Sequence, residues 1–83
     1  MEQELSLAQL PVGAAARIRQ ILSTGSMRRR LQDLGLIEGT RVCCVQKSPA
    51  GDPVAYEIRG AVIALRADDS SNILIQPWEN RWE

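Results

Sequence analysis

The 83-residue chain contains no histidine, and this absence narrows the chemistry that it can perform. Histidine is the commonest metal ligand and the usual general base near neutral pH. The only two cysteines, Cys43 and Cys44, are adjacent, and neighbouring side chains of a strand point to opposite faces. We therefore expect two small apolar residues there rather than a metal site. The composition predicts no cofactor and no enzyme activity.

The sequence also lacks an excess of either charge, because ten basic residues balance ten acidic ones. General nucleic-acid-binding domains usually carry a basic excess, so we expect no nucleic acid as partner. No apolar run reaches the roughly 18 residues of a membrane-spanning helix, and no secretory signal precedes the domain. These absences predict a protein of the cytoplasm that does not insert into a membrane.

Phenylalanine is absent too, so the core must be built mostly from isoleucine, leucine, valine and alanine. A chain of this length forms one domain and buries only about 60–65% of its unfolded surface. Many small residues in a small core favour a tight barrel. We expect a frayed N-terminus over residues 1–4, the domain over residues 5–76, and a C-terminal tail over residues 77–83.

The periodicity of apolar residues changes between residues 31 and 40, from a helical pattern before this stretch to strand patterns after it. Met27, Leu31 and Leu34 recur at spacings of four and three, which predicts a helix over residues 26–34 with these side chains on one face. Ser26 is expected to cap its first turn. Gly35 is expected to stop the helix through a positive φ, after which Leu36 folds back onto Leu31.

Most of the remaining sequence alternates between apolar and polar side chains, as half-buried strands do. Residues 5–10 are either a short strand or an extended lead-in, and a bulge or strand end is expected at residues 20–22. Gly60 marks the turn of a hairpin over residues 54–66, and residues 67–71 are too polar for a strand and suit a helical turn. Strands are predicted over residues 14–22, 40–47, 54–59, 61–66 and 73–76. About five short strands and one helix predict a mainly β fold, a small closed antiparallel barrel.

Two short segments are candidates for partner binding. Gly51, Asp52 and Pro53 form a loop that is either a docking site or a rigid turn in which the aspartate binds a nearby backbone N–H. Arg28, Arg29 and Arg30 form a basic cluster on the helix, which is either a solvated face or a contact for an acidic partner surface, nucleotide phosphates or RNA. RNA is disfavoured because the chain lacks a basic excess and interleaved aromatic residues.

Both tryptophans, Trp78 and Trp82, stand in the tail, four residues apart. In a helical tail they would share a face. Apolar area of this size is valuable to a small core, and exposed apolar patches often mark interfaces. We therefore expect the tail either to pack back on the barrel or to support self-association into a homo-oligomer.

Four stretches in order along the chain resemble the FeoA family, the small cytoplasmic partners of the bacterial ferrous iron transporter FeoB. Residues 31–40, Leu-Gln-Asp-Leu-Gly-Leu-Ile-Glu-Gly-Thr, are similar to the family's "RL-x-dLGL-x-pG" signature, with Glu38 where proline is common. Residues 48–54 are similar to its "aPlGDP" loop. Residues 60–66, ending Ala-Leu-Arg, and residues 73–75 are similar to its last two strands.

The resemblance implies an SH3-like barrel with a helical insertion. It also implies a non-catalytic accessory role in Fe2+ transport, in which the protein binds the cytoplasmic part of a FeoB-type transporter and modulates uptake. Fe2+ would then be the transported ion rather than a bound cofactor. Two alternatives stay open: an SH3-like interaction or regulatory module that acts with an iron-dependent repressor, and a weak transition-metal-binding protein.

Overall fold

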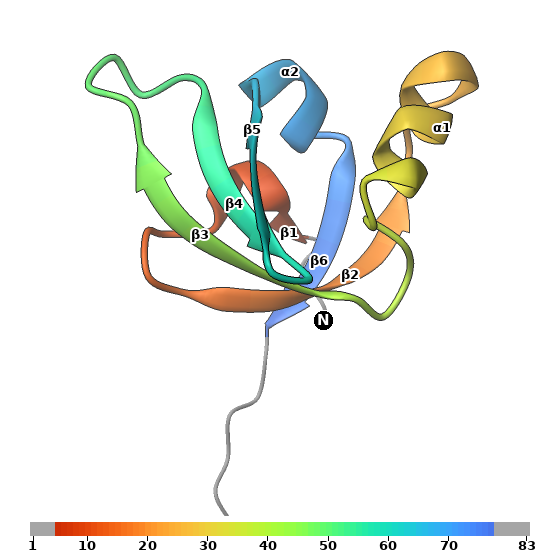
Figure 1. Ribbon diagram of the computed structural model, residues 1–83, viewed down its shortest axis with the longest axis horizontal. Helices are drawn as coiled ribbons and strands as arrows, with labels where there is room; N and C mark the ends of the chain where they lie inside the picture. The colour runs from red at the N-terminus through yellow and green to blue at the C-terminus, as the bar shows by residue number, and fades with distance from the viewer. Residues whose placement is uncertain (1–4, 78–83) are drawn as a thin grey trace, which may run out of the picture.

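The computed structural model describes residues 5–77, and these residues form a mainly β fold, as predicted (Figure 1). Trp78 and Trp82, for which the sequence predicts packing of the tail or self-association, lie outside the described residues. The elements in chain order are β1 (Leu5–Ser6), the 3-10 helix η1 (Leu7–Gln9), β2 (Ala15–Ile21), α1 (Gly25–Asp33), β3 (Arg41–Lys47), β4 (Val54–Ile58), β5 (Ala61–Leu65), α2 (Ala67–Ser70) and β6 (Ile73–Pro77).

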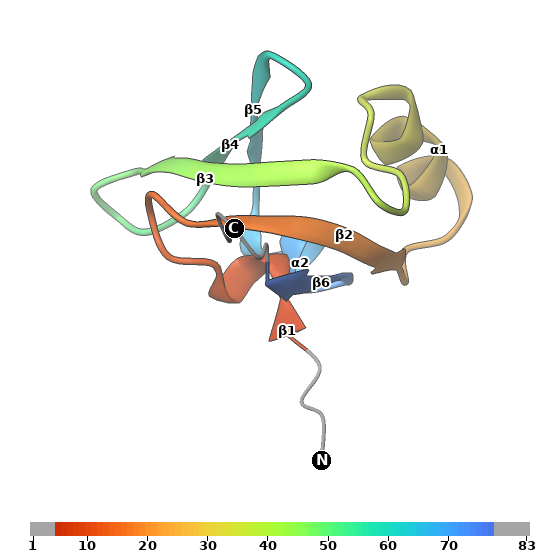
Figure 2. The same ribbon diagram turned by 90° about the horizontal axis from the view of Figure 1, so that it is seen from below.

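All six strands belong to one antiparallel sheet in the order β1-β6-β2-β3-β4-β5. The sheet is strongly curved, and Figure 2 shows β5 running across the direction of β2 and β3. Among the described residues, β1 and β5 each have a single neighbouring strand, so hydrogen bonds do not close the barrel. The expected closure is therefore corrected to a curled sheet with two edges, and the strand count rises from five to six because residues 5–6 pair with β6.

The core fills the concave side of this curled sheet. Tyr56 is its largest fully buried side chain, and the Tyr56 hydroxyl donates a hydrogen bond to the Leu7 carbonyl at 3.3 Å. This bond joins residues 49 positions apart and ties β4 to η1. The other buried apolar side chains come from every strand except β1, from η1, from α1 and from the segments that follow these two helices, and include Ala16, Ile18, Leu31, Leu36, Val42, Cys44, Ile58 and Ile73.

The strand patterns predict the buried faces well but misplace the register shift of β2. Ala16 and Ile18 are buried as expected, whereas the register shift of β2 lies between Ile18 and Gln20, slightly before the predicted position. The hairpin of β4 and β5 turns through Arg59 and Gly60, whose φ angles are 53° and 87°. Positive φ at both central residues is characteristic of a type I′ turn, which suits the twist of the flanking strands.

Helix α1 ends as predicted. The Leu36 N–H donates to the Leu31 carbonyl at 2.9 Å and the Gly35 N–H donates to the Gln32 carbonyl at 3.0 Å. This pair of bonds is the Schellman motif, and Gly35 has the positive φ of 103° that the motif requires. A Cβ on Gly35 would lie 3.0 Å from the Arg59 Cδ atom, so glycine also allows the helix end to approach the β4–β5 turn.

The start of α1 and one residue of its predicted inner face differ from expectation. Thr24 is the N-cap, with no side-chain cap hydrogen bond, so Ser26 lies within the first turn and does not cap it. Leu31 is fully buried and Met27 is half-buried against the core, but Leu34 is 38% exposed. Leu34 is the C-cap residue, where the chain already turns toward Gly35, and this turn takes its side chain off the inner face.

Candidate functional site

The three arginines of the predicted basic cluster are exposed, but they do not face one surface. Successive residues of a helix point about 100° apart, so three in a row spread over most of its circumference. Arg28 lines a groove between α1 and the end of β2, whereas Arg30 lines a groove between α1 and β5. Arg29 lines neither of these grooves. The structure therefore divides the cluster between two sides of the helix.

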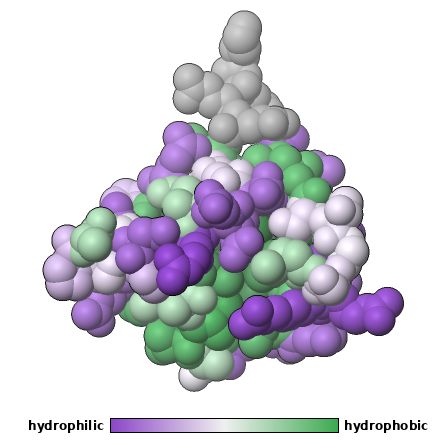
Figure 3. Space-filling view, turned by 90° about the horizontal axis from the view of Figure 1, so that it is seen from above, coloured by the Kyte–Doolittle hydropathy of each residue, from purple (hydrophilic) through white to green (hydrophobic). Residues whose placement is uncertain are grey.

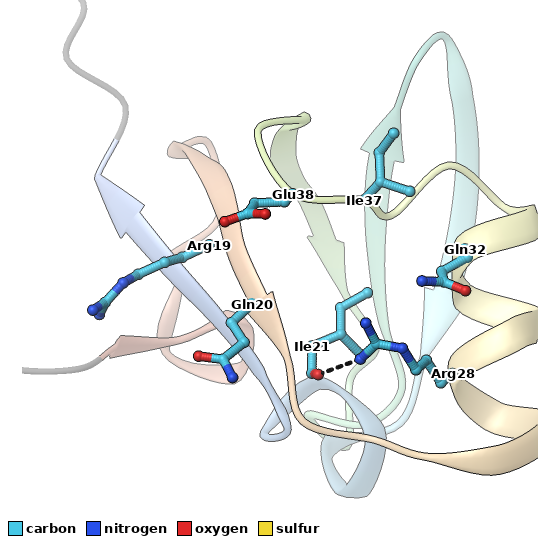
Figure 4. Close-up of a pocket in the computed structure, with 7 residues that line it drawn as sticks. All are labelled: Arg19, Gln20, Ile21, Arg28, Gln32, Ile37 and Glu38. Carbon is cyan, nitrogen blue, oxygen red and sulfur yellow. Dashed lines mark hydrogen bonds between the residues drawn. The ribbon is translucent and has the colours of Figure 1, made fainter.

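The groove on the β2 side has a volume of about 500 Å³ and is mostly polar (Figure 4). The guanidinium of Arg28 donates a hydrogen bond through Nη1 to the Ile21 carbonyl at 2.8 Å, which ties α1 to the end of β2. Figure 4 shows Arg19 pointing away from Arg28, so the two guanidinium groups do not converge on one anion-binding point. The other lining residues are Gln20, Gln32, Ile37 and Glu38.

The groove on the β5 side, called the α1–β5 groove here, is lined by both apolar and charged side chains. Its volume is about 210 Å³, and its lining residues are Met27, Arg30, Leu31, Ala64, Leu65, Arg66 and Asp69. Strand β5 is the end strand of the sheet, and its residues Ala61, Val62 and Ala64 are exposed. Figure 3 shows an apolar area on the side of the β4–β5 hairpin, beside the hydrophilic side chains on the side of α1.

The Gly51–Pro53 loop reaches the same side of the molecule through Asp52. One carboxylate oxygen, Oδ1, accepts a hydrogen bond from the Ala67 N–H at 2.8 Å, at the first residue of α2. The other, Oδ2, lies 4.0 Å from Nη1 of Arg66, an exposed ion pair of small energetic weight. The partner of Asp52 is thus fifteen residues away rather than in its own turn. Gly51 has a φ of 89°, and the Asp52–Pro53 peptide bond is cis.

The structure brings two of the predicted segments together around Arg66. Arg66 lines the α1–β5 groove with Arg30 and pairs with Asp52, so the helix and the loop border one surface. Arg66 was not predicted as a site residue, because a single arginine after a strand does not indicate which side chains will lie next to it. Arg28 and Arg29 stand apart from this surface.

Replacing Asp52 by alanine is expected to lower the free energy of unfolding by about 1 kcal/mol, because the Ala67 N–H loses a charged acceptor at a partly exposed site. Asparagine at position 52 keeps an acceptor oxygen and should recover part of this loss. Urea denaturation of the two variants beside the parent chain measures both effects. Equal stability of the alanine variant and the parent would show that the loop is not held by this bond.

The two cysteines lie on opposite faces of β3, as predicted. Cys44 is fully buried, and burial raises the pKa of its thiol above the ordinary value, whereas Cys43 is half-buried. Over residues 5–77, no group of three or more cysteine, aspartate or glutamate side chains is placed to hold a metal ion. In the same part of the chain, no helix is long and apolar enough to cross a membrane.

Comparison with protein families, curated sequences and solved structures identifies the family of the chain and its fold. A family model described as the FeoA domain matches residues 5–77. A curated relative from Porphyromonas gingivalis, the Fe(2+) transport protein A/Fe(2+) transporter FeoB fusion protein, is 31% identical over 72 residues. That match covers 87% of this chain but only 8% of the relative.

Solved structures show the same fold. The FeoA protein of Chlorobium tepidum superimposes with a TM-score of 0.86 at 26% identity, covering 94% of this chain and 74% of that one. The zinc-complexed FeoA of Stenotrophomonas maltophilia, described as a procaryotic SH3 domain protein, gives a TM-score of 0.78 at 25% identity, covering 87% and 89%. The SH3-like fold class that the sequence resemblance implied is thereby confirmed.

Proposed function

Because the chain belongs to the FeoA family, we propose that it is a non-catalytic accessory protein of ferrous iron transport that binds the cytoplasmic part of a FeoB-type transporter. The observation that carries this proposal is the P. gingivalis fusion protein, in which the FeoA and FeoB parts belong to one chain. A covalent link raises the effective concentration of one module near the other. A FeoA chain that is not fused to the transporter has to bind it with sufficient affinity to reach the same proximity. The S. maltophilia protein is described as a possible ferrous iron transport activating factor, which agrees with this role.

The docking surface in this proposal is the α1–β5 groove with the Gly51–Pro53 loop at its border. Arginine is enriched in the energetically important parts of interfaces, and the groove presents Arg30 and Arg66 beside apolar side chains such as Met27 and Ala64. The exposed edge strand β5 adds apolar side chains next to them, of which Val62 is 64% exposed. Arg28 and Arg29 do not line this groove and are left out of the proposed docking surface. The matching surface on the transporter's cytoplasmic domain would be acidic, because it has to complement Arg30 and Arg66.

Binding of this kind modulates transport only if the protein distinguishes between states of the transporter. A ligand shifts a conformational equilibrium by no more than its difference in affinity for the two states. The protein would therefore bind one state of the cytoplasmic domain more tightly and raise the population of that state. No chemical step by the accessory chain itself is needed, and Fe2+ passes through the transporter as its cargo.

Uptake of Fe2+ by cells that lack this protein tests the proposal. We expect slower uptake in the deletion strain and recovery when the parent chain is restored. Restoration with the Arg30→Glu variant should recover less, whereas Lys47→Glu, which reverses one exposed charge at the end of β3, should recover fully. Comparable protein levels must be verified by immunoblot. Normal uptake in the deletion strain would contradict the proposed function.

A further inference from the structure

Strand β5 leaves one edge of the sheet without a partner strand. It is the last strand in the order of the sheet, and β4 is its single neighbour among residues 5–77. The edge is accessible to solvent, because Ala61, Val62 and Ala64 are exposed and Val62 is 64% exposed. An exposed edge of this kind can accept a further strand from another chain.

The register of the β4–β5 hairpin shows which backbone groups face outward. The two-residue turn at residues 59–60 makes Ile58 and Ala61 a hydrogen-bonded pair. Bonded and non-bonded pairs alternate along antiparallel strands, so the N–H and C=O groups of Val62 and Ala64 point away from β4. Within residues 5–77, no backbone hydrogen bond from a turn, loop or helix end reaches these groups. β5 therefore presents two donors and two acceptors along its open edge.

The charges that surround this edge are mostly positive. Arg59 stands in the turn at one end of β5 and Arg66 follows its other end, and both are exposed. The α1–β5 groove beside the strand is lined by two arginines and one acidic residue, Arg30, Arg66 and Asp69. The exposed ion pair of Arg66 with Asp52 is weak and leaves room for a further contact. An added strand of about five residues spans about 17 Å and would run from one arginine to the other.

A second copy of this chain is a poor match for the edge. If two β5 strands paired antiparallel, Arg66 of each copy would lie beside the turn that carries Arg59 of the other. If they paired parallel, each arginine would meet its own counterpart. Like charges placed opposite each other destabilise strand pairing. The charges therefore favour an acidic strand over a second β5.

We propose that an acidic, extended segment of the transporter's cytoplasmic domain adds to β5 as a seventh strand of the sheet. The backbone of Val62 and Ala64 supplies the hydrogen bonds, and carboxylates near the two ends of the segment meet Arg59 and Arg66. This inference rests on the proposed function, because it states how the transporter is held at the surface assigned to it above.

Amide hydrogen exchange, followed by NMR, tests whether the edge becomes occupied. In the free protein the amides of Val62 and Ala64 should exchange faster than those of Ala61 and Ile63, which bond to β4. Saturation with the purified cytoplasmic domain of a FeoB-type transporter should slow exchange at Val62 and Ala64 by at least about tenfold. Exchange at Ala61 and Ile63 should change less, because their hydrogen bonds are already formed.

A matched pair of substitutions tests the backbone contact. Val62→Pro removes an N–H that does not bond to β4, so the hairpin keeps its own hydrogen bonds. We expect this variant to bind the cytoplasmic domain about tenfold more weakly, because one hydrogen bond to the added strand is lost. Val62→Thr keeps the N–H and a β-branched side chain and should bind like the parent chain. Circular dichroism verifies that both variants fold; if the proline variant does not, the exchange measurement on the parent chain decides.

The charge of the partner is tested at the turn. Arg59→Glu should weaken binding by about tenfold, because it places a carboxylate beside the acidic end of the added strand. Lys47→Glu makes the same change of charge at the end of β3 and should leave the affinity unchanged. Equal affinities of these two variants would contradict an acidic partner strand.

The outcomes separate this inference from the proposed function. Saturable binding without slower exchange at Val62 and Ala64, or with equal affinities of folded Val62→Pro and Val62→Thr, would overturn the inference alone. Slow exchange at the same amides in concentrated free protein, together with a dimer seen by sedimentation, would also overturn it, because the added strand would then come from a second copy. The absence of saturable binding would overturn both the inference and the proposed function.

Discussion

Replacing Tyr56 by alanine is expected to lower the free energy of unfolding by about 3–5 kcal/mol, a large part of the stability of a small domain. Tyr56 is only 1% exposed and fills the centre of the core, so its removal leaves a cavity that the surrounding strands cannot fill without moving. Its hydroxyl also ties β4 to η1. Urea denaturation followed by circular dichroism measures the loss.

The Tyr56→Phe variant separates the ring from the hydroxyl. It keeps the core filled and removes the hydroxyl, with its bond to the Leu7 carbonyl and its interaction with the Ser70 side chain. The Leu7 carbonyl still accepts from the Leu10 N–H at 3.1 Å. We therefore expect a loss of about 0.5–1.5 kcal/mol. A loss as large as that of the alanine variant would contradict the packing role assigned to the ring.

The pH dependence of stability gives a further check on Tyr56. Burial raises the pKa of its hydroxyl above the ordinary value of 10.0, although the nearby Ser70 side chain partly opposes this. The folded state then holds a proton that the unfolded state has released, so the free energy of unfolding falls as pH rises from about 10 through the folded-state pKa. The Tyr56→Phe variant should show a shallower fall over this range than the parent chain.

Leu31→Ala is expected to produce the second large effect, a loss of about 2–5 kcal/mol, because Leu31 is the buried anchor of α1. Leu34, three residues later, provides the matched control: it is 38% exposed, and its replacement by alanine should cost less than about 1 kcal/mol. Both changes keep a good helix former in place, so helix propensity does not explain a difference. Equal losses in the two variants would contradict the position of α1 against the sheet.

Local signals in the sequence predict the structure where they act over a few residues. The helix stop at Gly35 follows from one glycine between Leu34 and Leu36, and the hydrogen bonds of the stop are those of the expected motif. The alternation in residues 54–58 likewise predicts which side chains of β4 are buried. These features depend on local backbone conformation and on the alternation of side chains along a strand, and neighbouring residues determine both.

Long-range features could not be predicted in the same way. Nothing near β6 indicates that it lies between β1 and β2, and no local pattern shows that the end strands β1 and β5 do not pair with each other among the described residues. The bond from the Ala67 N–H to Asp52 spans fifteen positions, so loop chemistry alone does not reveal it. The same reason explains the candidate site: the basic cluster predicts exposed charge, but only the fold shows that Arg30 and Arg66 border one groove.

The most direct test of the account is a titration of the isotope-labelled chain with the purified cytoplasmic domain of a FeoB-type transporter, followed by NMR chemical shifts. We expect saturable shifts in α1, in the Gly51–Pro53 loop and in residues 64–66. We also expect Arg30→Glu to weaken binding by about tenfold, the loss typical of an interface arginine, and Lys47→Glu to leave it unchanged. No saturable binding, or shifts confined to surfaces away from α1 and β5, would contradict the account.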